Sequence, residues 1–160
     1  MGNCVSCKIE IHNNSKVYFL QPVDKSFIWG RMSDQTASLE PVFSGRKSIR
    51  GVQGRSDSIS GVEGSFTFDV IHEIHKVDVA RIKLNFDVPY DNNVYTRKAT
   101  SEINHVCNNN HIQISTTTTW GGYGFSQNTI SFSISTSDDQ KIKDEVKKYV
   151  ERQPKKRDEF

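Results

Sequence analysis

Hydrophobic and polar residues alternate along much of the chain. In residues 80–88, the apolar side chains of Ala80, Ile82, Leu84, Phe86 and Val88 are separated by polar ones. Because successive side chains of a strand point to opposite faces, this period of two predicts a strand with one buried face. Similar alternation, short apolar runs or β-branched runs occur at 8–12, 17–20, 66–70, 111–119 and 130–134.

Turn-forming residues separate these segments. Asparagine and glycine clusters stand at 13–15, 44–45, 91–93, 108–110 and 121–122, and single glycines at 54 and 61. Eight or nine short strands at this spacing predict an all-β fold, a two-sheet antiparallel β-sandwich. A hydrophobic content of 34% agrees with that fold, because its strands keep one polar face.

The C-terminal stretch has a different composition. From Asp138 to Phe160, 15 of the 23 residues are charged, and the apolar Ile142, Val146 and Val150 fall at helical spacing. We therefore expect a charged helical tail at 138–160 behind a β-sandwich domain at 8–137. The tail could also serve as a surface for a protein partner.

Charge and hydropathy exclude several classes of protein. The net charge of +2 gives no basic surface for nucleic acid. No apolar run is long enough to span a bilayer, and the first residues do not have the apolar region of a secretory signal. These features predict synthesis in the cytosol, where the three cysteines would be thiols or lipid sites.

The first seven residues form a candidate acylation segment. Met1, Gly2 and Ser6 match the N-myristoylation pattern M-G-x-x-x-[ST]. One myristoyl chain binds membranes weakly, so a second signal is needed, and Cys4 and Cys7 are candidates for palmitoylation, Cys4 being preferred. The alternatives are a chance match, half of a zinc site or a redox pair, although a second C-x-x-C is absent.

Two segments resemble known lipid-binding families. Residues 54–70 contain Gly-Arg-Ser-Asp followed by Gly61-x-x-Gly64-x-Phe66, and residues 28–31 read Ile-Trp-Gly-Arg. These motifs resemble the aegerolysins, whereas residues 86–96, with Val-Pro-Tyr-Asp, are similar to the actinoporins. Both families fold as β-sandwiches, and the resemblance covers about residues 7–136. It favours the aegerolysins and implies lipid recognition without catalysis.

The resemblance also implies a set of headgroup-binding residues. Pro89, Tyr90 and Tyr95 occupy positions of the actinoporin headgroup site, but Val94 stands where those proteins carry an exposed tryptophan. Independently, tyrosine and tryptophan prefer the bilayer interface, because an apolar ring carries a hydrated polar group. We therefore add the remaining aromatic residues of the loops: Trp29, Trp120, Tyr123 and Phe125. Trp120 or Phe125 could instead cap the core.

No catalytic, metal or cofactor motif stands out. The segment His72-Glu73-Ile74-His75 has three-residue spacing instead of the four that the zinc protease helix requires. We expect a non-enzymatic protein without a cofactor, whose partners are membrane lipids, with sphingolipid a candidate and a protein partner for pore formation an option. Acylation predicts the cytoplasmic face of a membrane, and extracellular release is the alternative. Other functions left open are a haemolytic cytolysin and a carbohydrate-binding lectin.

Overall fold

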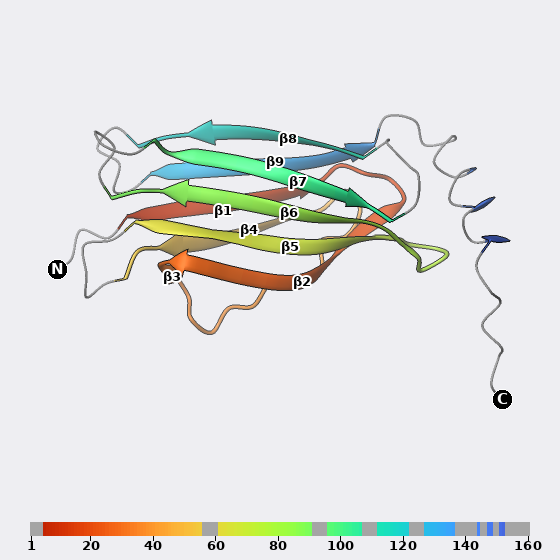
Figure 1. Cartoon of the computed structure of the whole chain (residues 1–160), viewed down its shortest axis with the longest axis horizontal. Coiled ribbons are helices and arrows are strands. Elements are labelled where there is room, and N and C mark those ends of the chain that lie inside the picture. The colour runs from red at the N-terminus through yellow and green to blue at the C-terminus, as the bar shows by residue number, and fades with distance from the viewer. Residues whose placement is uncertain are drawn as a thin grey trace.

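The computed structural model describes residues 5–55, 61–90, 96–106, 112–121 and 127–136, together with 144, 147–148 and 151–152. The described residues form an all-β sandwich, which confirms the predicted fold class (Figure 1). Its strands are β1 (Ser6–Asn13), β2 (Tyr18–Trp29), β3 (Arg31–Met32), β4 (Lys47–Gln53), β5 (Val62–His72), β6 (Asp78–Val88), β7 (Lys98–His105), β8 (Ile112–Thr119) and β9 (Asn128–Thr136).

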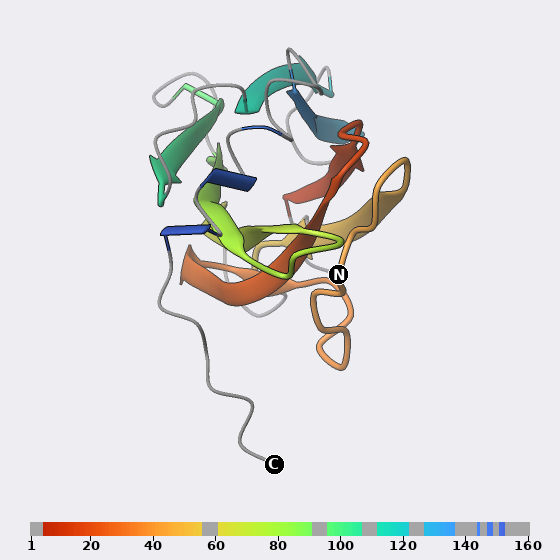
Figure 2. The ribbon, with the colours of Figure 1, turned by 90° about the vertical axis from the view of Figure 1, so that its right-hand side faces the viewer.

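The strands make two sheets that face each other as two layers (Figure 2). One sheet has the order β3-β4-β1-β9-β8 and the other the order β2-β5-β6-β7. Within the described residues, β1 and β9 pair in parallel, and the other pairings are antiparallel. The expectation of wholly antiparallel sheets is therefore wrong at this one place, where strands from opposite ends of the chain meet.

The core lies between the two sheets and comes from the alternating positions. Phe66, Phe68, Phe86 and Phe132 are buried completely or almost completely. The rings of Phe66 and Phe86 lie edge to face, with centroids 5.1 Å apart. Such a pair contributes about 1 kcal/mol beyond its area burial, so this contact stabilises the pairing of β5 with β6 on the inner face of their sheet.

β2 extends well beyond the short apolar run that predicts it. Its register shifts between Pro22 and Asp24 and again between Phe27 and Trp29. Proline has no N–H to donate, and an edge strand with irregular pairing tolerates it. β2 is an edge strand of its sheet, which explains why Pro22 does not end it.

The two ends of the chain do not simply match the predicted domain boundaries. The start differs from the prediction, and the predicted tail falls outside the described residues. β1 begins at Ser6, and Val5 is already buried, so the sandwich starts before the expected boundary at residue 8. The predicted tail at 138–160 lies almost entirely outside the described residues and stays a prediction. In the described part of the chain, no helix has the length and apolarity needed to cross a bilayer.

Candidate functional site

One end of the sandwich gathers the aromatic residues that the sequence singles out, and we call it the aromatic end. It carries Trp29 at the end of β2, Pro89 and Tyr90 after β6, and Trp120 after β8. The strand register brings these points together. At this end, Trp29 pairs with Glu63, Val62 with Val88, Asp87 with Lys98, Thr119 with Thr129 and Ser6 with Gln53.

Trp29 is the most exposed ring of the aromatic end. Its side chain is 62% exposed, and the neighbouring Ile28 is 65% exposed. Gly30 follows with a φ of 87°, a conformation that side chains rarely adopt. A Cβ atom at Gly30 would lie 2.5 Å from the backbone oxygen of Gln53. The glycine therefore allows a tight reversal from β2 into β3 that leaves Trp29 in solvent.

Trp120 occupies a different environment. Its ring is partly buried and packs against the hydrophobic core. The guanidinium carbon of Arg97 lies 5.3 Å from the ring centroid, which is a cation–π contact. Arg97 also donates a hydrogen bond of 2.8 Å to the backbone oxygen of Gly121. Of the two roles predicted for Trp120, capping of the core fits this geometry better than free presentation to solvent.

Asn128 holds the surroundings of Trp120 together. Its buried side-chain oxygen accepts hydrogen bonds from the Gly121 amide at 3.0 Å and from Arg97 at 3.1 Å. Its amide nitrogen donates to the backbone oxygen of Ser6 at 3.0 Å. One side chain thereby joins the start of β1, the start of β9 and the chain after β8. Asn128 was missed by the sequence analysis, because its partners are distant in sequence.

The two motifs that carry the family resemblances touch each other. Gly61 belongs to the aegerolysin-like motif, and a Cβ atom there would overlap the backbone of Val88, Pro89 and Tyr90. Only a glycine permits this approach. Tyr90 is partly buried against the core, so it contributes part of its ring to the surface. Pro89 and Tyr90 are therefore packed against neighbouring parts of the chain at the aromatic end.

The acylation candidates divide into described and undescribed residues. Gly2 and Cys4, like Tyr95, Tyr123 and Phe125, lie outside the described residues and stay predictions. Cys7 is 4% exposed in β1, and burial raises the pKa of its thiol to about 12. Because the thiolate is the reactive form, this placement argues against lipid attachment to Cys7 in the folded protein.

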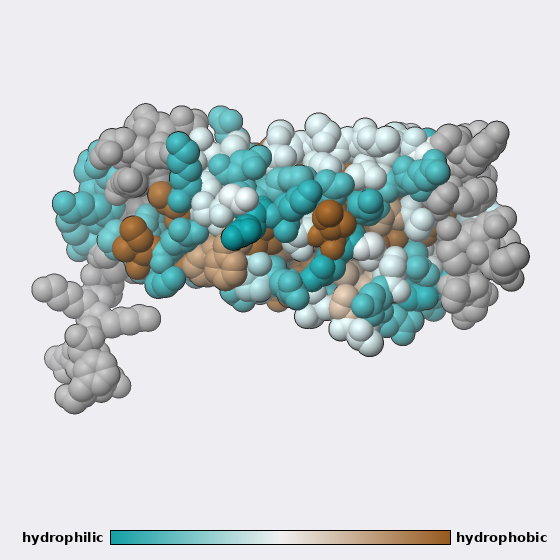
Figure 3. All heavy atoms as spheres, turned by 180° about the vertical axis from the view of Figure 1, so that it is seen from behind, coloured by the Kyte–Doolittle hydropathy of each residue, from teal (hydrophilic) through white to brown (hydrophobic). Residues whose placement is uncertain are grey.

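Away from the aromatic end, Phe43 is 55% exposed and its ring lies 5.8 Å from that of Phe19, centroid to centroid. On the face opposite to that in Figure 1, hydrophobic side chains lie apart from one another between hydrophilic and neutral ones (Figure 3). Scattered apolar residues of this kind are normal on protein surfaces. No group of three or more metal-binding side chains occurs in the part of the chain that the structure describes.

Comparisons with known proteins show a shared fold and distant sequences. No family model matches the chain, and no curated protein matches it. Among solved structures, the lipid-binding protein Nakanori superposes with a TM-score of 0.61 at 9% identity, covering 84% of this chain and 71% of its own. The RahU protein, solved in complex with a TRIS molecule, gives 0.53 at 12% identity, with 84% and 97% covered. IP-1A from Alcaligenes faecalis gives 0.50 at 15% identity, with 84% and 92% covered.

Proposed function

We propose that this chain is a non-enzymatic, peripheral membrane protein that binds lipid headgroups with the aromatic end of its sandwich. The observation that carries the proposal is the position of Trp29. This ring is exposed beside Ile28 at the end where Pro89, Tyr90 and Trp120 also lie. An indole placed this way can enter the bilayer interface and keep its N–H hydrated. Nakanori, which has a similar fold, is itself a lipid-binding protein.

The start of the chain supports the same orientation. Val5 accepts a hydrogen bond of 2.8 Å from the Gly54 amide, so the chain enters β1 at the aromatic end. In Figure 1, β1 begins on that side of the molecule. Acyl chains on Gly2 and Cys4 would therefore hold Trp29 close to the bilayer. Tethering raises the effective concentration of headgroups, so weak contacts suffice.

We also propose membership of the aegerolysin family and a sphingolipid target. The support is the contact of Gly61 with the Val88-Pro89-Tyr90 element, which joins the two family-like motifs in one structure. The cytoplasmic face of a membrane is the proposed location, because myristoylation acts on cytosolic chains. A haemolytic cytolysin, alone or with a protein partner, and a lectin remain the competing functions.

Vesicle co-sedimentation of the unacylated protein tests the headgroup site. We expect Trp29→Ser to weaken binding to sphingomyelin–cholesterol vesicles roughly tenfold, since the buried ring area is worth about 1–2 kcal/mol. The matched control is Ile74→Ser, because Ile74 is 76% exposed in the turn after β5, at the opposite end. Equal binding by both variants would refute the site.

Separate measurements test the anchor and the competing functions. Mass spectrometry of the protein from its native host reports myristate on Gly2, and Gly2→Ala should release the protein from cell membranes. Unchanged membrane fractionation of that variant would contradict the anchor. Dye release from the same vesicles would support a cytolysin, and binding on a glycan array would support a lectin.

A further inference from the structure

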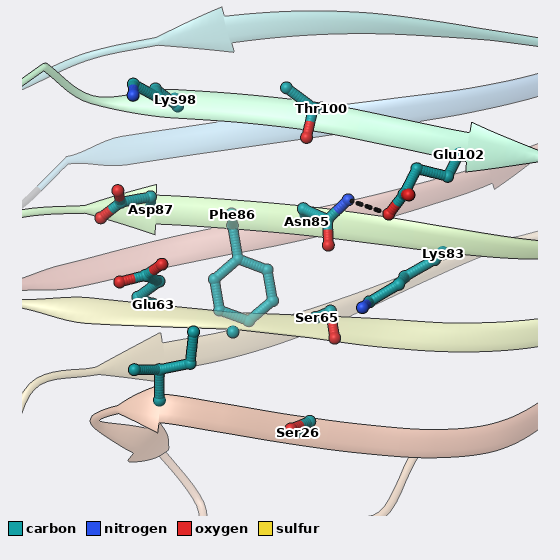
Figure 4. Close-up of a pocket in the computed structure, with 12 residues that line it drawn as sticks. Ser26, Glu63, Ser65, Lys83, Asn85, Phe86, Asp87, Lys98, Thr100 and Glu102 are labelled. Carbon is teal, nitrogen blue, oxygen red and sulfur yellow. Dashed lines mark hydrogen bonds between the residues drawn. The ribbon is translucent and has the colours of Figure 1, made fainter.

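The outer face of the β2-β5-β6-β7 sheet contains a groove next to the aromatic end. Its volume is about 410 Å³, within the range of about 300–1,000 Å³ typical of small-molecule sites. The groove is hollow because two small residues that line it, Ser26 and Ser65, pair across β2 and β5. Figure 4 shows rows of polar side chains from β5, β6 and β7 around it.

Two carboxylates face each other inside the groove. Glu63 on β5 is the direct cross-strand partner of Asp87 on β6. Like charges in this position repel each other. Burial raises the pKa of both carboxyl groups, and the charge of Asp87 raises the pKa of Glu63 further. The charge of Lys98, the cross-strand partner of Asp87, lowers both pKa values and offsets part of the repulsion. A second cation bound at the pair would relieve the remainder.

The floor of the groove holds an unsatisfied hydroxyl group. Ser65 is 7% exposed, and the alternation of β5 turns its side chain outward, into the groove. Its hydroxyl makes no hydrogen bond within the part of the chain that the structure describes. Buried hydroxyl groups almost always have a partner, so this one is available to hydrogen-bond a molecule that enters the groove. Beside it, Asn85 donates from its amide nitrogen to Glu102 at 3.1 Å, which leaves the amide oxygen available as an acceptor.

The charged residues that line the groove limit which kinds of ligand it can bind. Three carboxylates, from Glu63, Asp87 and Glu102, stand against the ammonium groups of Lys83 and Lys98. The remaining charge is a single negative one, which suits a monovalent cation. This net charge disfavours an anion, and it would neutralise only half the charge of a divalent metal ion.

We propose that this groove binds a primary ammonium group flanked by hydroxyl groups, as found in an amino sugar or in a sphingoid base. The ammonium group lies between the carboxylates of Glu63 and Asp87, where charge-assisted hydrogen bonds are strong. Neighbouring hydroxyl groups of the ligand pair with the hydroxyl of Ser65 and the amide oxygen of Asn85. The groove adjoins the aromatic end, since Ile28 lines it and Glu63 is the cross-strand partner of Trp29. The proposal does not require that Trp29 binds headgroups.

Amide NMR shifts of the labelled full chain in amine-free phosphate buffer test the site. We expect glucosamine to shift the amides of residues 63–65 and 87, and N-acetylglucosamine, without the ammonium group, to bind about tenfold more weakly. Phosphatidylcholine vesicles that contain sphingosine provide the lipid arm. Shifts with glucosamine alone assign a sugar amine, and shifts with sphingosine alone assign a lipid amine. No shift in either arm overturns the proposal.

Matched variants distinguish binding at this site from a general effect of removing a negative charge. Glu63→Gln should weaken glucosamine binding about tenfold, and it removes a repulsion, so the fold is retained. Asp69→Asn removes a carboxylate from the same face of β5 outside the groove, where Asp69 accepts a hydrogen bond from Arg81. Equal losses in the two variants, or equal binding of N-acetylglucosamine and glucosamine, overturn the proposal.

Discussion

Replacement of Asn128 by alanine removes the side chain that joins three segments at the aromatic end. The Gly121 amide, which is buried, loses its acceptor, at a cost of about 1–3 kcal/mol. The bond to the Ser6 oxygen is worth about 1 kcal/mol more. Arg97 keeps its hydrogen bond to the backbone oxygen of Gly121, so the loss of its bond to Asn128 adds little to the loss of stability. The expected loss is therefore about 3 kcal/mol.

Urea denaturation followed by circular dichroism measures this loss, and the melting temperature should fall by roughly 6–12 °C. Asn104→Ala is the matched control, because Asn104 is exposed on β7 and has no side-chain hydrogen bond to another described residue. We expect that variant to stay within about 0.5 kcal/mol of the wild type. A loss below about 1 kcal/mol for Asn128→Ala would refute the reasoning that this network fixes the aromatic end.

Three further predictions concern single positions. In the folded protein, Cys7 should resist iodoacetamide at pH 8 and react in urea, as read by mass spectrometry, because the pKa of its buried thiol is about 12. The raised pKa of Glu63 means that the folded protein binds this proton more tightly than the unfolded chain, so stability falls as pH rises above the ordinary value of 4.5. Glu63→Gln should make the free energy of unfolding less dependent on pH between 4 and 7, as measured by urea titration. An unchanged dependence would contradict the raised pKa of Glu63, which burial and then the charge of Asp87 cause. Gly30→Ala should lower the melting temperature more than Gly45→Ala, because both have a positive φ but only Gly30 would press its Cβ against a backbone oxygen.

The sequence predicts six of the strands at least in part: β1, β2, β5, β6, β8 and β9. The alternation is clearest in β5, β6 and β9, whose inward positions are mostly large and apolar. β4 and β7 were missed. The alternate positions of β7 include Ala99 and Ser101, which are small or polar and only half-buried at an edge of the sheet. An edge strand needs fewer apolar residues, so its pattern is weak.

The sequence predicts which residue types gather at the aromatic end, but it predicts less well how exposed each ring is. Local patterns place Trp29 and Trp120 after strands, and the register then brings both to one end. Whether a ring is exposed depends on distant neighbours, such as Arg97 over Trp120. The groove beside Glu63 could not be predicted from the sequence either, since its floor depends on pairings between strands and not on any local motif.

The parallel pairing of β1 with β9 has a consequence for the newly made chain. A ribosome adds about 5–20 residues per second, so Asn128 follows Ser6 by roughly 6–24 s. Throughout that interval β1 lacks the strand that later pairs with one of its edges. The folded environment that buries Cys7 is therefore complete only late in synthesis, and any modification of its sulfur would have to precede folding.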